Sequence, residues 1–351
     1  MIEGTAPASR QRKMLVAGIG RGSSRIINLL HENQSDLVDT LYISTDEKAV
    51  NYTRAGTKIL IGRRLCGGFG AEGLTDLGER AADDAKRDIE PYLQGYKMIL
   101  IVSTLGKGTG SGATPVISSL AESSGAFVMN FLILPSATLE SLHRTVGNHT
   151  RHQMIKRGFN VVTIDQDRFR EINGEQAFSM TLANLDALLS GVIMSLVDVI
   201  FGRAERGITI SDLKSLFKEG KEGSLHIGGG NLRFPRDAAC EFISCGLLRS
   251  DPRTGKGILL NLVTPAEARR ESTKPLIDEI FTQLGGGNRS VFIGTLRERD
   301  RRENVDLIGI ITGMDDGSVD IASLCKNESG SRPKAPSARI QQDRWDIPMI
   351  R

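Results

Sequence analysis

The sequence predicts an α/β protein with a parallel sheet, and three observations support this fold class. An apolar run at residues 98–102 meets a glycine-rich turn and continues as a helical pattern from Ala113. A second unit of the same kind runs from a strand at residues 13–18 through a glycine-rich loop into the helical pattern of residues 26–30. In the second half, strand candidates and a long helical segment at 265–284 predict a further, smaller α/β layer.

Composition agrees with a protein of two ordinary domains. The chain has 351 residues, of which 39% are hydrophobic and 25% charged. We expect a cytoplasmic protein without membrane insertion, because no apolar run looks long enough to span a bilayer and residues 1–12 lack the core of a signal peptide. The net charge of +3, without basic runs carrying aromatics, argues against nucleic acid. Four cysteines without a CxxC pair and five histidines without zinc spacing imply neither a disulfide framework nor a structural metal.

The glycine-rich turn at residues 106–112 has the features of an anion-binding loop. It lies between a strand end and a helix start, where backbone N–H groups and the helix dipole attract negative charge. Thr109 and Ser111 add hydroxyls, and the four glycines in these seven residues let a phosphate approach the backbone. The alternative is a tight turn without a ligand. A Walker A loop is excluded, because Gly108 follows Lys107 where that motif needs serine or threonine.

The turn resembles the signature loop of the tubulin and FtsZ GTPases, GGGTGSG, with Lys107 in place of the middle glycine. The earlier loop at 18–28 is similar to the first loop of FtsZ, GVGGGGGNAVN, and aligns with it without gaps. It is a poor dinucleotide fingerprint, because Ser23 replaces the third glycine and Asp39 precedes the next strand instead of ending it. The resemblance implies GTP or GDP with Mg²⁺ as ligands, bound in a Rossmann-like domain with a long core helix.

Further segments resemble this family and extend the predicted site. Asp46 follows a strand at 40–44, in a loop similar to the family's NTDAQAL, and would lie near the phosphate-bound magnesium. Residues 58–85 resemble the loop that closes over the terminal phosphate; Cys66 beside it is either a redox handle or a buried thiol. Asp186, on the predicted core helix, would accept hydrogen bonds from guanine. The residues that the resemblance assigns to the nucleotide are Gly20, Arg21, Gly22, Ser23, Ser24, Arg25, Gly70, Ala71, Gly106, Lys107, Gly108, Thr109, Gly110, Ser111, Glu140, Arg144, Gln166 and Asp186.

Some of these assignments have an alternative interpretation or depart from the family pattern. Glu140 and Arg144 keep the spacing of a family pair that contacts ribose and phosphate, but the same spacing also fits a surface ion pair on a helix. Gln166 replaces the asparagine that reads guanine in the family. At Lys107 we expect a backbone penalty of about 1 kcal/mol, because glycine adopts left-handed conformations freely.

Asp212 is the predicted catalytic residue. The segment 207–214 resembles the synergy loop, which in these polymers enters the nucleotide pocket of the next subunit and positions the attacking water. The family pattern NxDxxD reads GxTxxD here, so that Gly207 and Thr209 replace two polar positions and Asp212 remains. We therefore expect a slow GTPase whose active site is shared between adjacent subunits. Without the resemblance, Asp212 would be assigned to a helix cap or to solvent.

The predicted domain organisation follows from these segments. Residues 1–12 form a disordered arm, 13–183 the GTP-binding domain, 184–202 the core helix, 203–215 the synergy loop with the start of a helix, and 216–314 a C-terminal domain with strands at 257–263, 291–295 and 306–312. Residues 315–344 are a polar, flexible linker. The end of the chain resembles the FtsZ tail peptide LDIPxFLR, which binds membrane tethers and division regulators, and consists of Trp345, Asp346, Ile347, Pro348, Met349, Ile350 and Arg351.

The resemblance implies a GTP-hydrolysing cytoskeletal protein that polymerises head to tail with itself, for ring assembly in bacterial-type cell division. We add the hypothesis that Arg21 and Lys107 replace part of the charge neutralisation normally left to magnesium. Three alternatives stay open: a paralogue that forms nucleotide-stabilised filaments with little turnover, a dinucleotide-binding enzyme, and a monomeric regulator that caps other filaments.

Overall fold

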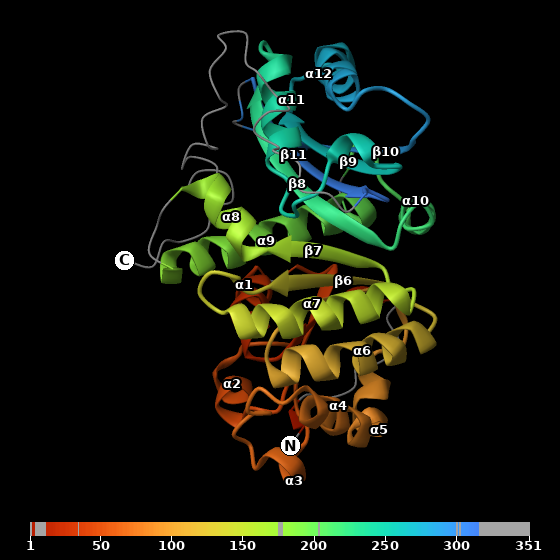
Figure 1. Cartoon of the computed structure of the whole chain (residues 1–351). Helices are drawn as coiled ribbons and strands as arrows, with labels where there is room; N and C mark the ends of the chain where they lie inside the picture. Colours follow the sequence, from red (N-terminus) through yellow and green to blue (C-terminus); the bar gives the residue numbers. More distant parts are fainter. Residues whose placement is uncertain are drawn as a thin grey trace. The chain divides into compact units, whose positions relative to one another are not determined.

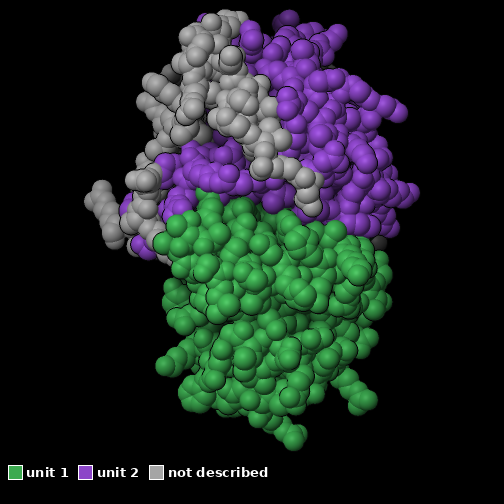
Figure 2. Space-filling view, in the orientation of Figure 1, with its two compact units in different colours: residues 1–167 green, residues 168–351 purple. Residues whose placement is uncertain are grey.

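The structure is a computed structural model that describes residues 2–3, 12–33, 35–174, 178–202, 204–299, 301 and 303–315. It divides into two compact units, Met1–Asp167 and Arg168–Arg351, which Figure 2 distinguishes by colour. The boundary between these units falls before the predicted domain boundary at residue 183. The linker at 316–344 and the tail at 345–351 lie outside the described residues.

The first unit contains a mostly parallel sheet, which confirms the predicted fold class (Figure 1). Its strand order is β1-β4-β3-β2-β5-β6-β7, in which the pairs among β2 to β7 are parallel and β1 is antiparallel to β4. The strands are β1 (Ile2–Glu3), β2 (Arg12–Ile19), β3 (Val38–Ser44), β4 (Thr57–Leu60), β5 (Tyr96–Thr104), β6 (Phe127–Leu134) and β7 (Val161–Asp165).

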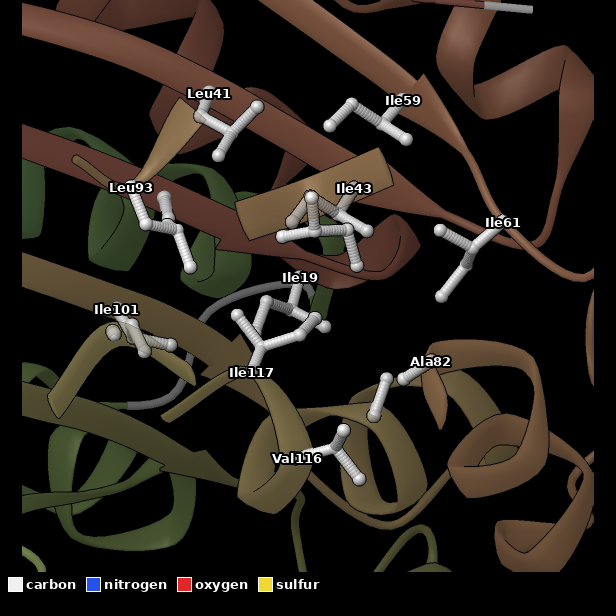
Figure 3. Packing of buried hydrophobic residues seen from close by; sticks show 14 of the residues in the cluster. Ile19, Leu41, Ile43, Ile59, Ile61, Ala82, Leu93, Ile101, Val116 and Ile117 are labelled. Carbon is white, nitrogen blue, oxygen red and sulfur yellow. The ribbon is translucent and has the colours of Figure 1, made fainter. Parts of the chain in front are cut away.

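The central strands are apolar at nearly every position because both of their faces are covered. All eight residues of β6 are buried, which is typical of parallel strands between helical layers. In Figure 3, Ile19, Ile43 and Ile101 from neighbouring strands pack with Ile117 of a helix in one core cluster. The helices of this unit are α1 (Ser24–Glu32), α2 (Glu47–Tyr52), α3 (Arg63–Cys66), α4 (Thr75–Asp84), α5 (Lys86–Ile89), α6 (Gly108–Ser123) and α7 (Ser141–Lys156); α8 (Gln166–Asn173) begins at its end.

The predicted arm at residues 1–12 needs a correction. Ile2 and Glu3 form β1, which pairs with Ile59 and Lys58 of β4, and β2 already begins at Arg12. An edge strand offers unpaired backbone groups, so a short segment can add to it without a strong sequence signal. The other residues of the arm lie outside the described part of the chain.

The strands of the second unit are in the order β8-β11-β9-β10. Strand β11 is antiparallel to both β8 and β9, whereas β9 and β10 are parallel. The elements are α9 (Phe178–Phe201), α10 (Ile210–Leu216), β8 (Glu222–Asn231), α11 (Pro235–Ser244), β9 (Gly257–Pro265), α12 (Arg270–Gln283), β10 (Ser290–Glu298) and β11 (Asn304–Thr312). The predicted core helix at 184–202 thus begins earlier, at residue 178.

The strand β8 and the helix α11 were not anticipated from the sequence. The run Gly228-Gly229-Gly230 weakens the strand signal, because glycine has no side chain to pack and is depleted in strands. The structure explains these glycines by packing: a Cβ at Gly228 would lie 2.5 Å from Cα of Phe242, and one at Gly230 would lie 2.9 Å from Cβ of Ala238. Both neighbours are on α11, so the missing side chains let this helix lie directly on the strand.

The apolar helix α9 corrects a second expectation. By length and composition its segment Ser179–Phe201 could cross a membrane, although we had expected no such run. About 61% of the most apolar stretch of this segment is buried inside the protein, as in the core helix of a globular domain.

Candidate functional site

The predicted site residues of the first unit gather at one edge of its sheet. Strands β2 to β7 are parallel, so their carboxyl ends lie together, and this is where ligands bind in open α/β sheets. The loops at this edge hold the predicted residues Gly20–Ser23, Asp46, Gly70, Ala71, Gly106, Lys107, Glu140 and Gln166.

The beginning of α6 has the properties of an anion site. The helix starts at Gly108, and its N-cap residue Lys107 makes no side-chain capping hydrogen bond. The first N–H groups of a helix lack intrahelical partners and stand at the positive end of its dipole. The oxygen Oγ of Ser111 accepts from the N–H of Gly106 at 2.8 Å, which holds the preceding turn and leaves the O–H of this serine as a donor. These groups fit a phosphate.

Close packing explains the glycines of this loop, whereas the sequence analysis attributes them to the approach of a phosphate. Gly106 alone among the loop glycines 106, 108, 110 and 112 has a positive φ, of 97°, and a Cβ there would lie 2.5 Å from the carbonyl oxygen of His143. Gly108 is the first residue of α6 and its φ is not positive, but an added Cβ would lie 2.7 Å from Cβ of Ala71. Similarly, a side chain on Gly112 would meet the carbonyl oxygen of Thr75 at the start of α4. Gly108 and Gly112 therefore allow α6 to pack closely against the loop before α4 and the start of α4, whether or not a phosphate approaches them.

Lys107 does not occupy a strained position. Its φ of −110° and ψ of 166° are ordinary extended values, so the expected backbone penalty is wrong. Its side chain is 67% exposed and its Nζ lies 3.6 Å from Oε1 of Glu140. The same carboxylate oxygen lies 3.2 Å from Nδ1 of His143. Glu140 therefore holds a cationic side chain beside the α6 turn.

The first glycine loop lies directly against the α6 turn. Gly20 has a φ of 75°, and its Cβ would lie 3.2 Å from the backbone nitrogen of Gly110. The buried Ser23 donates its hydroxyl to the carbonyl of Gly20 at 2.9 Å. The exposed residues Arg21 and Arg25 border this loop, whereas Ser24 donates its hydroxyl to the carbonyl of Arg21 at 2.9 Å.

Two further loops join this arrangement. The hydroxyls of Thr45 and Thr109 lie 2.6 Å apart, which ties the loop after β3 to the first turn of α6. The backbone N–H of Gly70 donates to the carbonyl of Thr45 at 3.1 Å, so the loop that contains the buried Ala71 folds back onto the same place. Thr45 is a contact of the site that the sequence argument missed. The signal was its position directly before Asp46 at a strand end.

Asp46 is partly engaged in the fold. Its Oδ1 accepts from the N–H of Ala49 at 3.1 Å as the N-cap of α2, and its Oδ2 lies 3.9 Å from Nη1 of Arg21. Among the described residues, no group of three or more His, Cys, Asp or Glu could hold a metal ion. A magnesium ion here would therefore depend mainly on the oxygens of a bound nucleotide, with Asp46 as the candidate protein group.

Cys66 is a buried thiol, in line with the second of its two predicted interpretations. It lies on α3, and burial, with a further contribution from Glu72, raises the pKa of the thiol above its usual value. Because the thiolate is the reactive form, this environment makes Cys66 a poor nucleophile.

Arg144 pairs with a residue that the sequence analysis did not assign to the site. Its Nη1 and Nη2 donate to Oδ1 and Oδ2 of Asp165 at 2.8 and 2.7 Å, and Nη1 also donates to the carbonyl of Pro135 at 3.0 Å. The alternative surface pair with Glu140 is not formed. Burial acts to lower the pKa of Arg144, but the hydrogen bonds and charge of Asp165 outweigh it, so the net shift is upward. Asp165 stands where the resembling family has proline, which is why the motif did not identify this pair.

The remaining side chains at this edge hold the loop after β6. Oε1 of Gln166 accepts from the N–H of Ser136 at 3.2 Å, and Oδ2 of Asp167 accepts from the N–H of Ala137 at 2.6 Å. The side-chain oxygen of Gln166 is thus already used within the protein.

We predict that Asp165→Asn lowers the free energy of unfolding by about 3 kcal/mol. The side chains of Arg144 and Asp165 are 17% and 4% exposed, and removal of one charge from a buried pair leaves the other uncompensated. Urea denaturation measures the effect. The control is Glu32→Gln, which breaks an exposed pair with Arg54 and should change stability by less than about 1 kcal/mol. Equal losses in the two variants would contradict the prediction.

The predicted residues of the second unit are Asp186 and Asp212. Asp186 lies partly exposed on α9, and its guanine contact stays a prediction. Asp212 closes a capping box at the start of α10: its Oδ2 accepts from the N–H and from the hydroxyl of Thr209, each at 2.8 Å. Asp212 is therefore the N3 residue of the capping box and not the N-cap itself, which is Thr209, and any catalytic role must be compatible with this contact.

The strands, helices and edge loops define a Rossmann-like α/β fold. Residues 13–174 match the family model described as Tubulin/FtsZ family, GTPase domain. Among curated proteins, "Cell division protein FtsZ 1" of Archaeoglobus fulgidus is 23% identical over 303 residues, covering 85% of this chain and 81% of the relative. "Cell division protein FtsZ 1" of Pyrococcus abyssi is 25% identical over 304 residues, covering 86% and 81%.

Solved structures show the same fold. A structure titled "FtsZ dimer, empty (M. jannaschii)" has a TM-score of 0.78 and 22% identity, over 90% of this chain and 92% of that one. "CetZ2 from Haloferax volcanii - GTPgS bound protofilament" has a TM-score of 0.75 and 16% identity, over 89% and 96% of the two chains. At these identities the likeness establishes the fold alone.

Proposed function

We propose that the protein binds and hydrolyses GTP and polymerises head to tail into filaments, as a cytoskeletal protein of bacterial-type cell division in the cytoplasm. The observation that carries this proposal is the uncapped start of α6, against which the glycine loop at Gly20 and the loops at Thr45 and Gly70 fold. This arrangement suits a polyphosphate, and it lies within the segment that matches a GTPase domain. A dinucleotide-binding enzyme would not account for that match.

In this proposal the phosphates contact the first N–H groups of α6 and the hydroxyls of Thr45 and Thr109. Arg21 and Lys107, whose side chains are 84% and 67% exposed, turn toward the bound phosphates and neutralise part of their charge. A magnesium ion, when bound with the nucleotide, supplies the remaining positive charge. Because the two cations belong to the chain, some assembly should persist in a chelator, and its complete loss would contradict this part.

The hydrolytic part of the proposal rests on Asp212 acting on the nucleotide of a neighbouring subunit. Its carboxylate would hold and deprotonate the attacking water, while the α6 N–H groups hold the phosphate oxygens. The tail at 345–351 would bind a membrane tether or division regulator, as the resemblance implies.

The direct test uses the purified full chain with GTP and, separately, with ATP. We expect the protein to pellet and to release phosphate with GTP, and to do neither with ATP. Sedimentation and a phosphate assay on the same samples measure the two responses. Equal responses to GTP and ATP would contradict the proposed guanine specificity. Phosphate release without pelleting would contradict the proposed filament.

A second candidate function is a nucleotide-stabilised filament with little turnover. The capping box favours it, because Thr209 already occupies one oxygen of the Asp212 carboxylate. Such a scaffold would pellet with GTP, keep the bound nucleotide intact and release almost no phosphate.

A further inference from the structure

A cavity in the second unit is lined by none of the residues assigned above to the nucleotide or to catalysis, although Glu205 and Arg206 lie in the segment 203–215 that resembles the synergy loop. Its volume is about 440 Å³, within the range of small-molecule sites. Three parts of the unit form its walls: the segment between α9 and α10, the turn from β9 into the first half of α12, and the edge strand β10. The lining residues that carry charge are Glu205, Arg206, Arg269, Lys274 and Arg297.

The walls of this cavity are held by hydrogen bonds between distant segments. Arg206 and Thr295 form an antiparallel bridge in which the N–H of Thr295 donates to the carbonyl of Arg206 at 2.9 Å. Arg297 donates from Nε and Nη2 to the two carboxylate oxygens of Glu205 at 2.6 and 2.9 Å, and from Nη1 to the carbonyl of Ala266 at 2.9 Å. The cavity is therefore a built feature of the fold and not a gap between loose loops.

Three cations of this cavity have no counter-ion in the described part of the chain. Arg297 is neutralised by Glu205, but Arg206, Arg269 and Lys274 make no ion pair among the residues that the structure describes. Exposed cations are usually just solvated. Here, however, they come from two separate segments and border one hollow, so their mutual repulsion is relieved by an anion that enters it.

The floor of the cavity is apolar. Ile277 of α12 and Ile293 of β10 line it and pack against the core of the unit. An inorganic anion would satisfy the cations but leave this floor exposed to water. A ligand with an anionic group and a small organic body would use both, and guanidinium groups match phosphate oxygens in paired hydrogen bonds.

We propose that this cavity binds a small organic phosphate, with Arg206, Arg269 and Lys274 as the phosphate ligands and Ile277 and Ile293 beneath its organic body. The site is distinct from the nucleotide site of the first unit, and the proposal does not depend on GTP binding.

The test uses ribose 5-phosphate as the probe and calorimetric titration of the full chain, with GDP in excess so that the first unit does not take up the probe. We expect binding, and a loss of affinity of about tenfold or more in the double variant Arg269→Gln/Lys274→Gln, because charge-assisted hydrogen bonds are removed. These side chains are exposed and unpaired, so the variant should fold. Urea denaturation checks this.

The matched control is Lys218→Gln/Arg299→Gln, which also removes one lysine and one arginine charge, from exposed positions of the same unit outside the cavity. It should bind the probe within about twofold of the wild type. Three outcomes would overturn the proposal: no binding, equal weakening by both double variants, or inorganic phosphate binding as tightly as the probe. A change in self-association without probe binding would likewise overturn it and assign the cavity to an acidic segment of a second copy.

Discussion

Asp212→Ala is expected to lower GTP-dependent phosphate release by about 100- to 10,000-fold, which is the usual contribution of a positioned general base. The affinity of the unassembled protein for GTP should not change, because in the proposed mechanism this carboxylate acts on the nucleotide of another subunit. Phosphate release at saturating GTP and nucleotide binding below the concentration of assembly measure the two quantities separately.

The variant also removes the capping box, which by itself costs about 1 kcal/mol of stability. Asp212→Asn separates the effects, because asparagine keeps an acceptor for Thr209 but cannot take a proton. Asp237→Ala is the matched control, since Asp237 occupies the first turn of α11 and is exposed. If Asp212→Ala hydrolyses GTP as fast as the wild type, the shared active site is wrong. If neither the wild type nor Asp212→Ala releases phosphate but both pellet with GTP, the protein is a nucleotide-stabilised scaffold and not an enzyme.

Gly110→Ala is expected to lower the free energy of unfolding by about 3 kcal/mol or more and to abolish GTP binding. The added Cβ would overlap the carbonyl oxygen of Thr104 on β5 and lie 3.2 Å from Oγ of Ser103. Because the overlap is with backbone, α6 must move away from the strand, and overpacking of this kind costs about 1–3 kcal/mol or more. Urea denaturation and nucleotide titration measure the two effects.

Gly147→Ala provides the matched control on α7. The nearest atom to its added Cβ, Cβ of Leu105, lies 3.3 Å away, and alanine favours a helix more than glycine does. Its stability should stay within about 1 kcal/mol of the wild type. A Gly110→Ala protein that is as stable as this control would show that the glycine is there for a ligand alone and that the close packing against β5 is unimportant.

The structure bears out the elements that a local pattern predicts. A buried apolar run followed by glycines and a helical period predicts a strand, a turn and a helix, and these are β5, Gly106 and α6. The carboxyl ends of parallel strands must meet at one edge, so the positions of Asp46 and Glu140 near that turn followed from their places after β3 and β6. The sequence did not predict strand β8, because its glycines are required by close packing against α11, a helix that follows it in the chain.

What the sequence by itself determined was the fold class and the places of the glycine-rich loops, since these depend on periodicity, on glycine and on motifs of adjacent residues. What the tertiary structure decided was the partner of each side chain. Arg144 binds Asp165 and not Glu140, Lys107 binds Glu140, and Gly112 makes room for α4. The physical reason is that a hydrogen bond or a close contact depends on ångström distances between segments far apart in the chain, and no local pattern carries that information.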